Sequence, residues 1–190
     1  ICALSLLSTG RIFNKLIIKN IEVNFFENII YGFILFSFLS LTLNFFISLN
    51  QNLNLIILIA SLLIYFFNSK NNYKKDLIYV LIISFFSVVV MSFENINRPD
   101  GGLYHFPFIN ILNENKLIVG LSNLHFRYGH ISIIQYFSSI YNNILFTDNG
   151  ILVPSSIIFF SLLGYLLCEI FRKDSDIIYK FLSLMFSLYI

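Results

Sequence analysis

Long runs without a charged residue alternate along the chain with short polar or basic segments. No Asp, Glu, Lys or Arg occurs within residues 28–69 or 77–93. A helix needs about 20 apolar residues to cross a bilayer, so the first run suffices for two crossings, with residues 50–52 as the turn. We predict an all-α, polytopic membrane protein of a single domain. Its spans are expected near residues 1–9, 28–49, 53–68, 77–93, 149–171 and 177–190.

Residues 131–147 carry no formal charge but have two different sides. Ser132, Gln135, Ser139 and Asn142 recur at steps of three and four residues, and apolar side chains fill the other side. Such a helix is typical of a segment that lies along a membrane surface rather than crossing it. We therefore predict a surface helix over these residues.

Composition supports the membrane interpretation. Hydrophobic residues make up 57% of the chain and charged residues 12%, whereas a soluble domain carries roughly 25% charged residues. Lipid is therefore the expected solvent. The net charge of +2 gives no basis for binding nucleic acid. The chain begins at Ile1 without a methionine and ends inside an apolar run, so we expect a fragment of a longer protein. Cys2 and Cys168 both lie in apolar runs and are expected to be packing residues.

Basic residues indicate how the spans are oriented. Eight of the twelve Lys and Arg residues fall into three groups, which are Arg11, Lys15 and Lys19, then Lys70, Lys74 and Lys75, then Arg172 and Lys173. Cytoplasmic loops collect such residues. An even number of crossings separates the groups only if 131–147 does not cross. The loop 94–148 is then extracytoplasmic, and the protein is expected to be a multi-pass protein of the inner (plasma) membrane.

The extracytoplasmic loop holds the candidate chemistry. Residues 99–102 read Pro-Asp-Gly-Gly, which is a turn signature, and residues 103–116 are predicted to form a helix. Asp100 is then either an ordinary helix cap or a carboxylate with a catalytic task. His105 follows about one and a half helical turns later. It either packs among aromatic residues or faces the same cleft as Asp100.

A second polar group lies at residues 120–130 and contains His125, Arg127 and His130. A guanidinium binds phosphate through two parallel hydrogen bonds. Together with Asp100 and Arg98, this group is suited to binding a phosphate. A divalent metal is the alternative, but a metal needs convergent ligands, and the spacing does not establish convergence. We therefore predict no cofactor and no metal.

The residues from Asp100 to Arg127 resemble the signature of an uncharacterised family of bacterial multi-spanning proteins. That pattern runs Asp, then Leu-Tyr-His at 103–105, then an apolar helix, then Gly-Leu-x-Asn-Leu-His-x-Arg at 120–127. The match covers about 30 residues, and the flanking spans are similar only in hydropathy.

The layout is also similar to that of the GT-C glycosyltransferases. Those polytopic enzymes use lipid-linked sugars and carry an acidic residue in their first large extracytoplasmic loop, followed by amphipathic surface helices. Asp100, helix 103–116 and helix 131–147 would fill those places. The chain departs from that pattern in two ways. About three spans precede the span that leads into the loop, and no paired acidic motif is present.

The resemblance implies roles for individual residues. Asp100 would be the general base, and the residues that bind substrate or phosphate would be Tyr104, His105, Asn123, His125 and Arg127. The donor would be a polyprenyl-phosphate-linked sugar used in cell-envelope glycan synthesis. The alternative is a non-enzymatic membrane protein, such as a transporter or a structural component of envelope polysaccharide export. A third interpretation is a folded loop that binds lipid headgroups.

Overall fold

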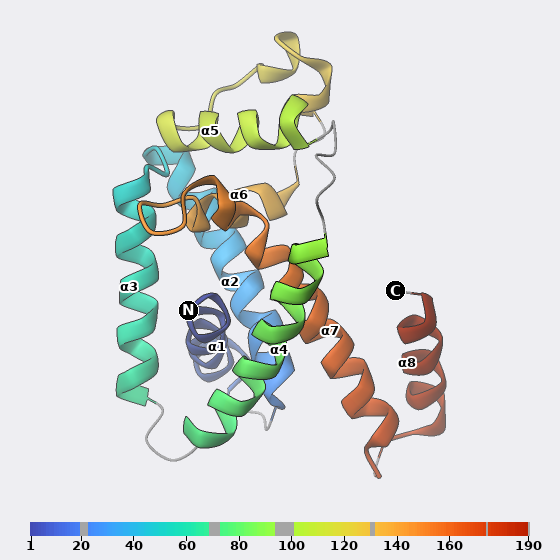
Figure 1. The fold of residues 1–190 in the computed structure, drawn as a ribbon. Coiled ribbons are helices and arrows are strands. Elements are labelled where there is room, and N and C mark those ends of the chain that lie inside the picture. The colour runs from blue at the N-terminus through green and yellow to red at the C-terminus, as the bar shows by residue number, and fades with distance from the viewer. Residues whose placement is uncertain (20–22, 69–72, 94–100, 130–131, 174, 190) are drawn as a thin grey trace.

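The computed structural model describes residues 1–19, 23–68, 73–93, 101–129, 132–173 and 175–189, and within these residues it contains helices and no strand (Figure 1). The α-helices are α1 (Cys2–Phe13), α2 (Phe25–Phe46), α3 (Gln51–Asn68), α4 (Tyr73–Phe93), α5 (Phe106–Glu114), α6 (Ile133–Tyr141), α7 (Val153–Phe171) and α8 (Ile177–Tyr189). The shorter turns are the π-helices η1 (Asn14–Ile18) and η2 (Gly101–His105) and the 3-10 helices η3 (Leu121–Asn123), η4 (Phe126–Gly129) and η5 (Thr147–Ile151). The predicted all-α class is confirmed.

Three helical segments among the described residues are long and apolar enough to cross a membrane. They are Phe25–Phe46, Tyr73–Ser92 and Thr147–Phe171. At 1.5 Å per residue, the 22 residues of α2 rise about 33 Å, which matches a hydrocarbon core of about 30 Å. α3 and α8 are also apolar but shorter, and the 13 residues of α8 rise only about 20 Å.

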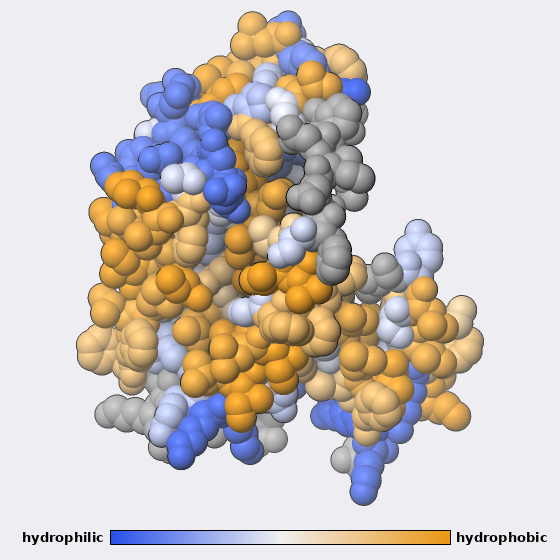
Figure 2. All heavy atoms as spheres, in the orientation of Figure 1, coloured by the Kyte–Doolittle hydropathy of each residue, from blue (hydrophilic) through white to orange (hydrophobic). Residues whose placement is uncertain are grey.

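The surface of these helices is apolar. Phe67 on α3, Phe85 on α4 and Leu188 on α8 are 75%, 64% and 76% exposed. Figure 2 shows hydrophobic residues covering the middle of the visible face, with hydrophilic residues gathered toward its two ends. Water is a poor solvent for such a surface, whereas lipid tails solvate it without cost. The pattern supports the membrane interpretation.

α1 is enclosed by the other helices and continues beyond the predicted span 1–9. It crosses α2 at two glycines, because a Cβ at Gly10 would lie 1.6 Å from the Asn28 carbonyl oxygen and one at Gly32 would lie 1.9 Å from the Leu6 carbonyl oxygen. Gly10 therefore permits a close helix crossing. The helix that contains the expected span 1–9 runs on to Phe13.

Several helix ends lie together at one end of the molecule, at the bottom of Figure 1. They are the N-terminal ends of α2 and α4 and the C-terminal ends of α3 and α7. Arg11 of α1 joins them there, because its Nη2 lies 2.8 Å from Asp76 Oδ1 in the first turn of α4. The Tyr65 hydroxyl of α3 donates to the other oxygen of the same carboxylate at 3.3 Å. Basic residues of all three predicted groups thus belong to segments that meet at this end.

The opposite end carries the loop between α4 and α7. α5 lies across the ends of α2 and α3 (Figure 1). Two backbone hydrogen bonds fix it there, from Leu49 N–H to Leu112 O (2.9 Å) and from Leu117 N–H to Asn44 O (2.8 Å). The second bond draws the chain out of helical geometry beyond Glu114. The predicted helix 103–116 is consequently shorter, with η2 before it and an extended Asn115 after it.

The predicted surface helix 131–147 is α6, and it differs from the prediction in length and surroundings. Its nine residues rise about 14 Å, too little to cross a bilayer. Asn143 ends it, because the Asn143 side-chain oxygen accepts from the N–H groups of Leu145 (3.0 Å) and Phe146 (3.3 Å). Residues 135–143 are all buried. The protein therefore covers the polar residues of this helix as well as its apolar ones.

The polar side of α6 is buried because other helices supply its hydrogen-bond partners. The Asn54 amide nitrogen of α3 donates to Ser139 O (2.7 Å) and Asn142 O (3.2 Å). The Asn142 amide nitrogen donates to Asn110 Oδ1 of α5 at 3.4 Å. The amphipathic pattern thus describes a contact between protein elements.

Candidate functional site

Three of the candidate residues, Arg98, Asp100 and His130, lie outside the described residues. Asp100 precedes Gly101, with which η2 begins. The described part of the candidate site therefore starts directly after the proposed base, and it contains Tyr104, His105, Asn123, His125 and Arg127.

Tyr104 and His105 are the last two residues of η2. A π-helical turn is rare and is frequently found at functional sites. The turn begins with Gly101 and Gly102, and a Cβ built on Gly102 would meet nothing within 4 Å. Tyr104 and His105 are both half-buried, so a ligand can reach them while the protein still holds them in place.

Arg127 reaches the same place from η4. Its guanidinium carbon lies 4.9 Å from the centre of the Tyr104 ring, and the Tyr104 ring lies 4.2 Å from the ring of His105. A guanidinium stacked on an aromatic face is held electrostatically and presents its N–H groups along its edge. The structure thus brings a cation to an imidazole and a phenol that lie more than 20 residues before it in the sequence.

His125 and Asn123 lie on the same segment as Arg127 but have different surroundings. The Nδ1 atom of His125 accepts from the backbone N–H of Arg127 at 3.3 Å, and its ring stacks on Phe126 at 5.2 Å. Asn123 is exposed on η3, where its backbone N–H donates to Gly120 O at 2.9 Å. His125 is therefore tied to the Arg127 backbone, whereas Asn123 belongs to the preceding turn.

Gln135 of α6 also belongs to this site, although the sequence suggested no role for it there. Its Nε2 lies 2.7 Å from His105 Nδ1. Ser132 and Gln135 form the capping box of α6, and the Ser-x-x-Gln spacing was the signal that Gln135 turns back toward the start of its helix. We refer to Tyr104, His105, Arg127 and Gln135 as the loop cluster.

A small apolar core supports the loop cluster. Phe108 is buried and lies 5.9 Å, ring centre to ring centre, from both Tyr128 and Tyr136. Burial raises the pKa of the Tyr136 hydroxyl, so this phenol stays protonated at neutral pH. Its place in the core is consistent with a supporting role.

Metal ligation has little support in the described part of the chain. No group of three or more His, Cys, Asp or Glu side chains gathers there at a spacing suited to a metal ion. The members of the loop cluster are a cation, two uncharged polar groups and an imidazole. That set suits an anion better than a cation.

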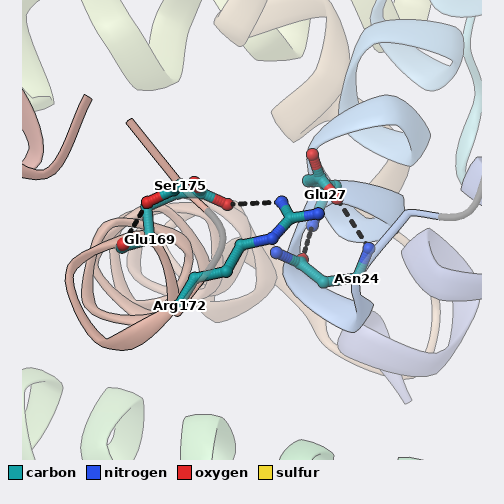
Figure 3. Close-up of polar contacts among 5 residues, drawn as sticks. All are labelled: Asn24, Glu27, Glu169, Arg172 and Ser175. Carbon is teal, nitrogen blue, oxygen red and sulfur yellow. Dashed lines mark hydrogen bonds and ion pairs between the residues drawn. The ribbon is translucent and has the colours of Figure 1, made fainter. Parts of the chain in front are cut away.

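A second polar region lies at the opposite end of the bundle. A cleft of about 310 Å³ between the start of α2 and the end of α7 is lined by Asn24, Glu27, Cys168, Glu169, Phe171 and Arg172. Figure 3 shows the Arg172 side chain between Glu169 and the α2 residues, and its Nη1 lies 3.1 Å from Glu169 Oε1. Glu27 is engaged in the capping box of α2 with Asn24. Each of these bonds lies within one helix end, so local contacts account for the pairing of these polar groups.

Comparison with known proteins gives a family but no activity. No curated protein and no solved structure matches the chain. A family model described as a domain of unknown function (DUF8201) matches residues 1–190. Because this match covers the whole sequence, the chain belongs to the DUF8201 family.

Proposed function

We propose that this protein is a glycosyltransferase of the GT-C type that takes its sugar from a polyprenyl-phosphate donor at the extracytoplasmic face of a cell membrane. The observation that carries the proposal is the stacking of Arg127 on Tyr104 beside His105. This set of groups suits a phosphate. It lies at the end of an apolar bundle, where a lipid-linked phosphate would reside and its prenyl chain could enter the lipid.

In the proposed reaction, an acceptor hydroxyl oxygen attacks the anomeric carbon of the donor sugar. Asp100 takes the hydroxyl proton as general base. The bond between the anomeric carbon and the phosphate oxygen breaks, and the electron pair leaves with the phosphate. Arg127 stabilises the charge that develops on that phosphate, with His105 and His125 as further hydrogen-bonding groups.

The test is turnover of a radiolabelled polyprenyl-phosphate sugar by the purified protein in detergent. We expect label to move to an added acceptor with the wild-type chain. Asp100→Asn, which keeps the shape of the side chain but removes its basicity, is expected to abolish transfer while expression and membrane insertion stay unchanged. Wild-type turnover by Asp100→Asn would refute the base assignment.

Binding without catalysis is the second candidate. It is favoured by the chemistry of the loop cluster, because a guanidinium, a phenol, an amide and an imidazole can all contact an anion. In that case the protein would hold a lipid-linked glycan or a lipid headgroup for another protein to process or export. Saturable donor binding without turnover, unchanged in Asp100→Asn, would favour this candidate over the enzyme.

A further inference from the structure

Gln135 lies between two partners, and only one orientation of its amide satisfies both. Its Oε1 lies 3.1 Å from the Ser132 backbone nitrogen, and its Nε2 lies 2.7 Å from His105 Nδ1. A backbone N–H can only donate, so the Gln135 atom facing it must be the oxygen. The amide nitrogen therefore faces His105.

The orientation of this amide determines the state of the imidazole. An amide NH₂ group donates and does not accept, so Nδ1 of His105 must accept the bond. A neutral imidazole carries one proton, and that proton then sits on Nε2. We infer that Gln135 is a positioning residue that holds His105 as the Nε2–H tautomer, leaving a hydrogen-bond donor on the side of the ring away from Gln135.

The position of Gln135 is set by the helical bundle rather than by the loop. Gln135 is 7% exposed and belongs to the first turn of α6, whose far end is fixed by Asn54 of α3. His105 is the last residue of η2, which leads directly into α5. The hydrogen bond from Gln135 therefore transmits the orientation of a packed helix to a half-exposed imidazole.

This arrangement suits an anionic ligand beside a cation. Two other groups of the loop cluster lie near His105, the Tyr104 ring at 4.2 Å and, stacked on that ring, the Arg127 guanidinium. A neutral His105 adds an N–H donor without placing a second positive charge beside Arg127. The identity of the group that this N–H binds, a phosphate oxygen of the sugar donor, rests on the proposed function. The assignment of the tautomer does not rest on it.

The state of the imidazole can be measured directly. We would label the full chain with ¹⁵N-histidine in detergent micelles at alkaline pH, where imidazoles are neutral, and assign His105 by the signals lost in His105→Asn. We expect Nδ1 of His105 to show the shift of an unprotonated nitrogen and Nε2 that of a protonated one. The reverse pattern would overturn the inference.

The matched variant is Gln135→Glu. A glutamate at this position preserves the capping box of α6 but presents an acceptor to His105, so the proton is expected to move to Nδ1. His125 is the internal control, because its Nδ1 accepts from the Arg127 backbone and its signals should not change. Unchanged His125 signals also report that the loop has kept its fold. A His105 tautomer that is the same in both proteins would overturn the role of Gln135.

A comparison of a short-chain prenyl phosphate with inorganic phosphate tests what the Nε2–H group of His105 binds. We expect prenyl phosphate to shift the His105 Nε2–H signal and to bind about 10-fold more weakly to Gln135→Glu, because a hydrogen bond to an anion is lost. An equal response to inorganic phosphate would show that the site takes phosphate without the lipid, which contradicts the lipid-linked donor. An Nε2–H tautomer with no response to either phosphate would refute phosphate binding while leaving the Gln135 assignment in place.

Discussion

Arg127 combines a full positive charge with a flat shape, and the loop cluster uses both. The guanidinium carbon lies over the Tyr104 ring at 4.9 Å, and a planar fork can bind two phosphate oxygens at once. Lysine keeps the charge but has neither the fork nor the flat face. The proposed donor site therefore depends on arginine at this position and not on charge alone.

We predict that Arg127→Ala raises the Kd for prenyl phosphate by about 10- to 100-fold, the effect of losing hydrogen bonds from a charged group. Arg127→Lys should fall between the alanine variant and the wild type. The matched control is Lys116→Ala, which removes an exposed cation from the same loop without touching the loop cluster. An equal loss in Lys116→Ala would mean that Arg127 acts only through the general charge of the loop.

The sequence could predict which residues of the loop carry chemistry but not how they meet. Leu-Tyr-His at 103–105 and His-x-Arg at 125–127 were recognisable as polar groups in an apolar chain. Their contact depends on two turns, η2 and η4, whose π and 3-10 geometry has no periodic signal. The sequence shows Gln135 only as one of the polar residues on one side of helix 131–147. Its contact with His105 could not be predicted, because His105 lies 30 positions away.

At the scale of elements, one asparagine joins the loop to the membrane bundle. The Asn54 amide nitrogen donates to Ser139 O and Asn142 O at the end of α6, and also to Leu49 O (2.7 Å) before α3. A buried carbonyl that loses its donor costs about 1–3 kcal/mol. Asn54 is fully buried, so water cannot replace it.

We predict that Asn54→Ala lowers the free energy of unfolding by about 1–3 kcal/mol, and that Asn54→Asp does so at least as strongly, because a carboxylate places an acceptor against carbonyl oxygens. Thermal unfolding in detergent would measure both. Asn52→Ala, an exposed position on the same helix, is the control. A melting temperature for Asn54→Ala equal to that of Asn52→Ala would argue against this anchoring role.

The crossing of α1 and α2 gives an independent test of the packing. Alanine at Gly10 or Gly32 would place its Cβ within 2 Å of a backbone oxygen on the other helix, so the helices must move apart. We expect each substitution to lower stability by about 1–3 kcal/mol, the usual effect of overpacking. Gly102→Ala should be neutral, because its Cβ meets open space. Neutral behaviour at Gly10 would contradict the close crossing.

The existence of the helices was easier to predict than their ends. Runs without charge located α2, α3, α4 and α7 to within a few residues, because lipid selects for apolar length alone. The ends of α5 and α6 differ from those expected, because a backbone hydrogen bond from Leu117 to Asn44 follows α5 and local hydrogen bonds to the Asn143 side chain follow α6. The distribution of apolar and polar residues along the sequence does not predict those hydrogen bonds.

At the scale of the whole molecule, the loop cluster and the basic groups occupy opposite ends. Arg11 pairs with Asp76 at the start of α4, and Arg172 lies in the cleft beside the start of α2. η2, α5 and α6 lie at the other end (Figure 1). If the basic end faces the cytoplasm, as positively charged loops generally do, the loop cluster faces outward, where the proposed donor would be used.

Cysteine labelling tests this orientation. In a chain carrying Cys2→Ala and Cys168→Ala, we would introduce single cysteines by Val119→Cys, at a loop residue that is 93% exposed, or by Lys173→Cys, after α7. In intact cells, a membrane-impermeant maleimide is expected to label only the Val119 variant, and permeabilisation should expose the Lys173 variant as well. Labelling of the Lys173 variant alone would reverse the orientation and place the proposed donor site on the cytoplasmic side. Labelling of both in intact cells would mean that the two ends do not lie on opposite sides of a membrane, because α7, which separates them in sequence, would then not cross it.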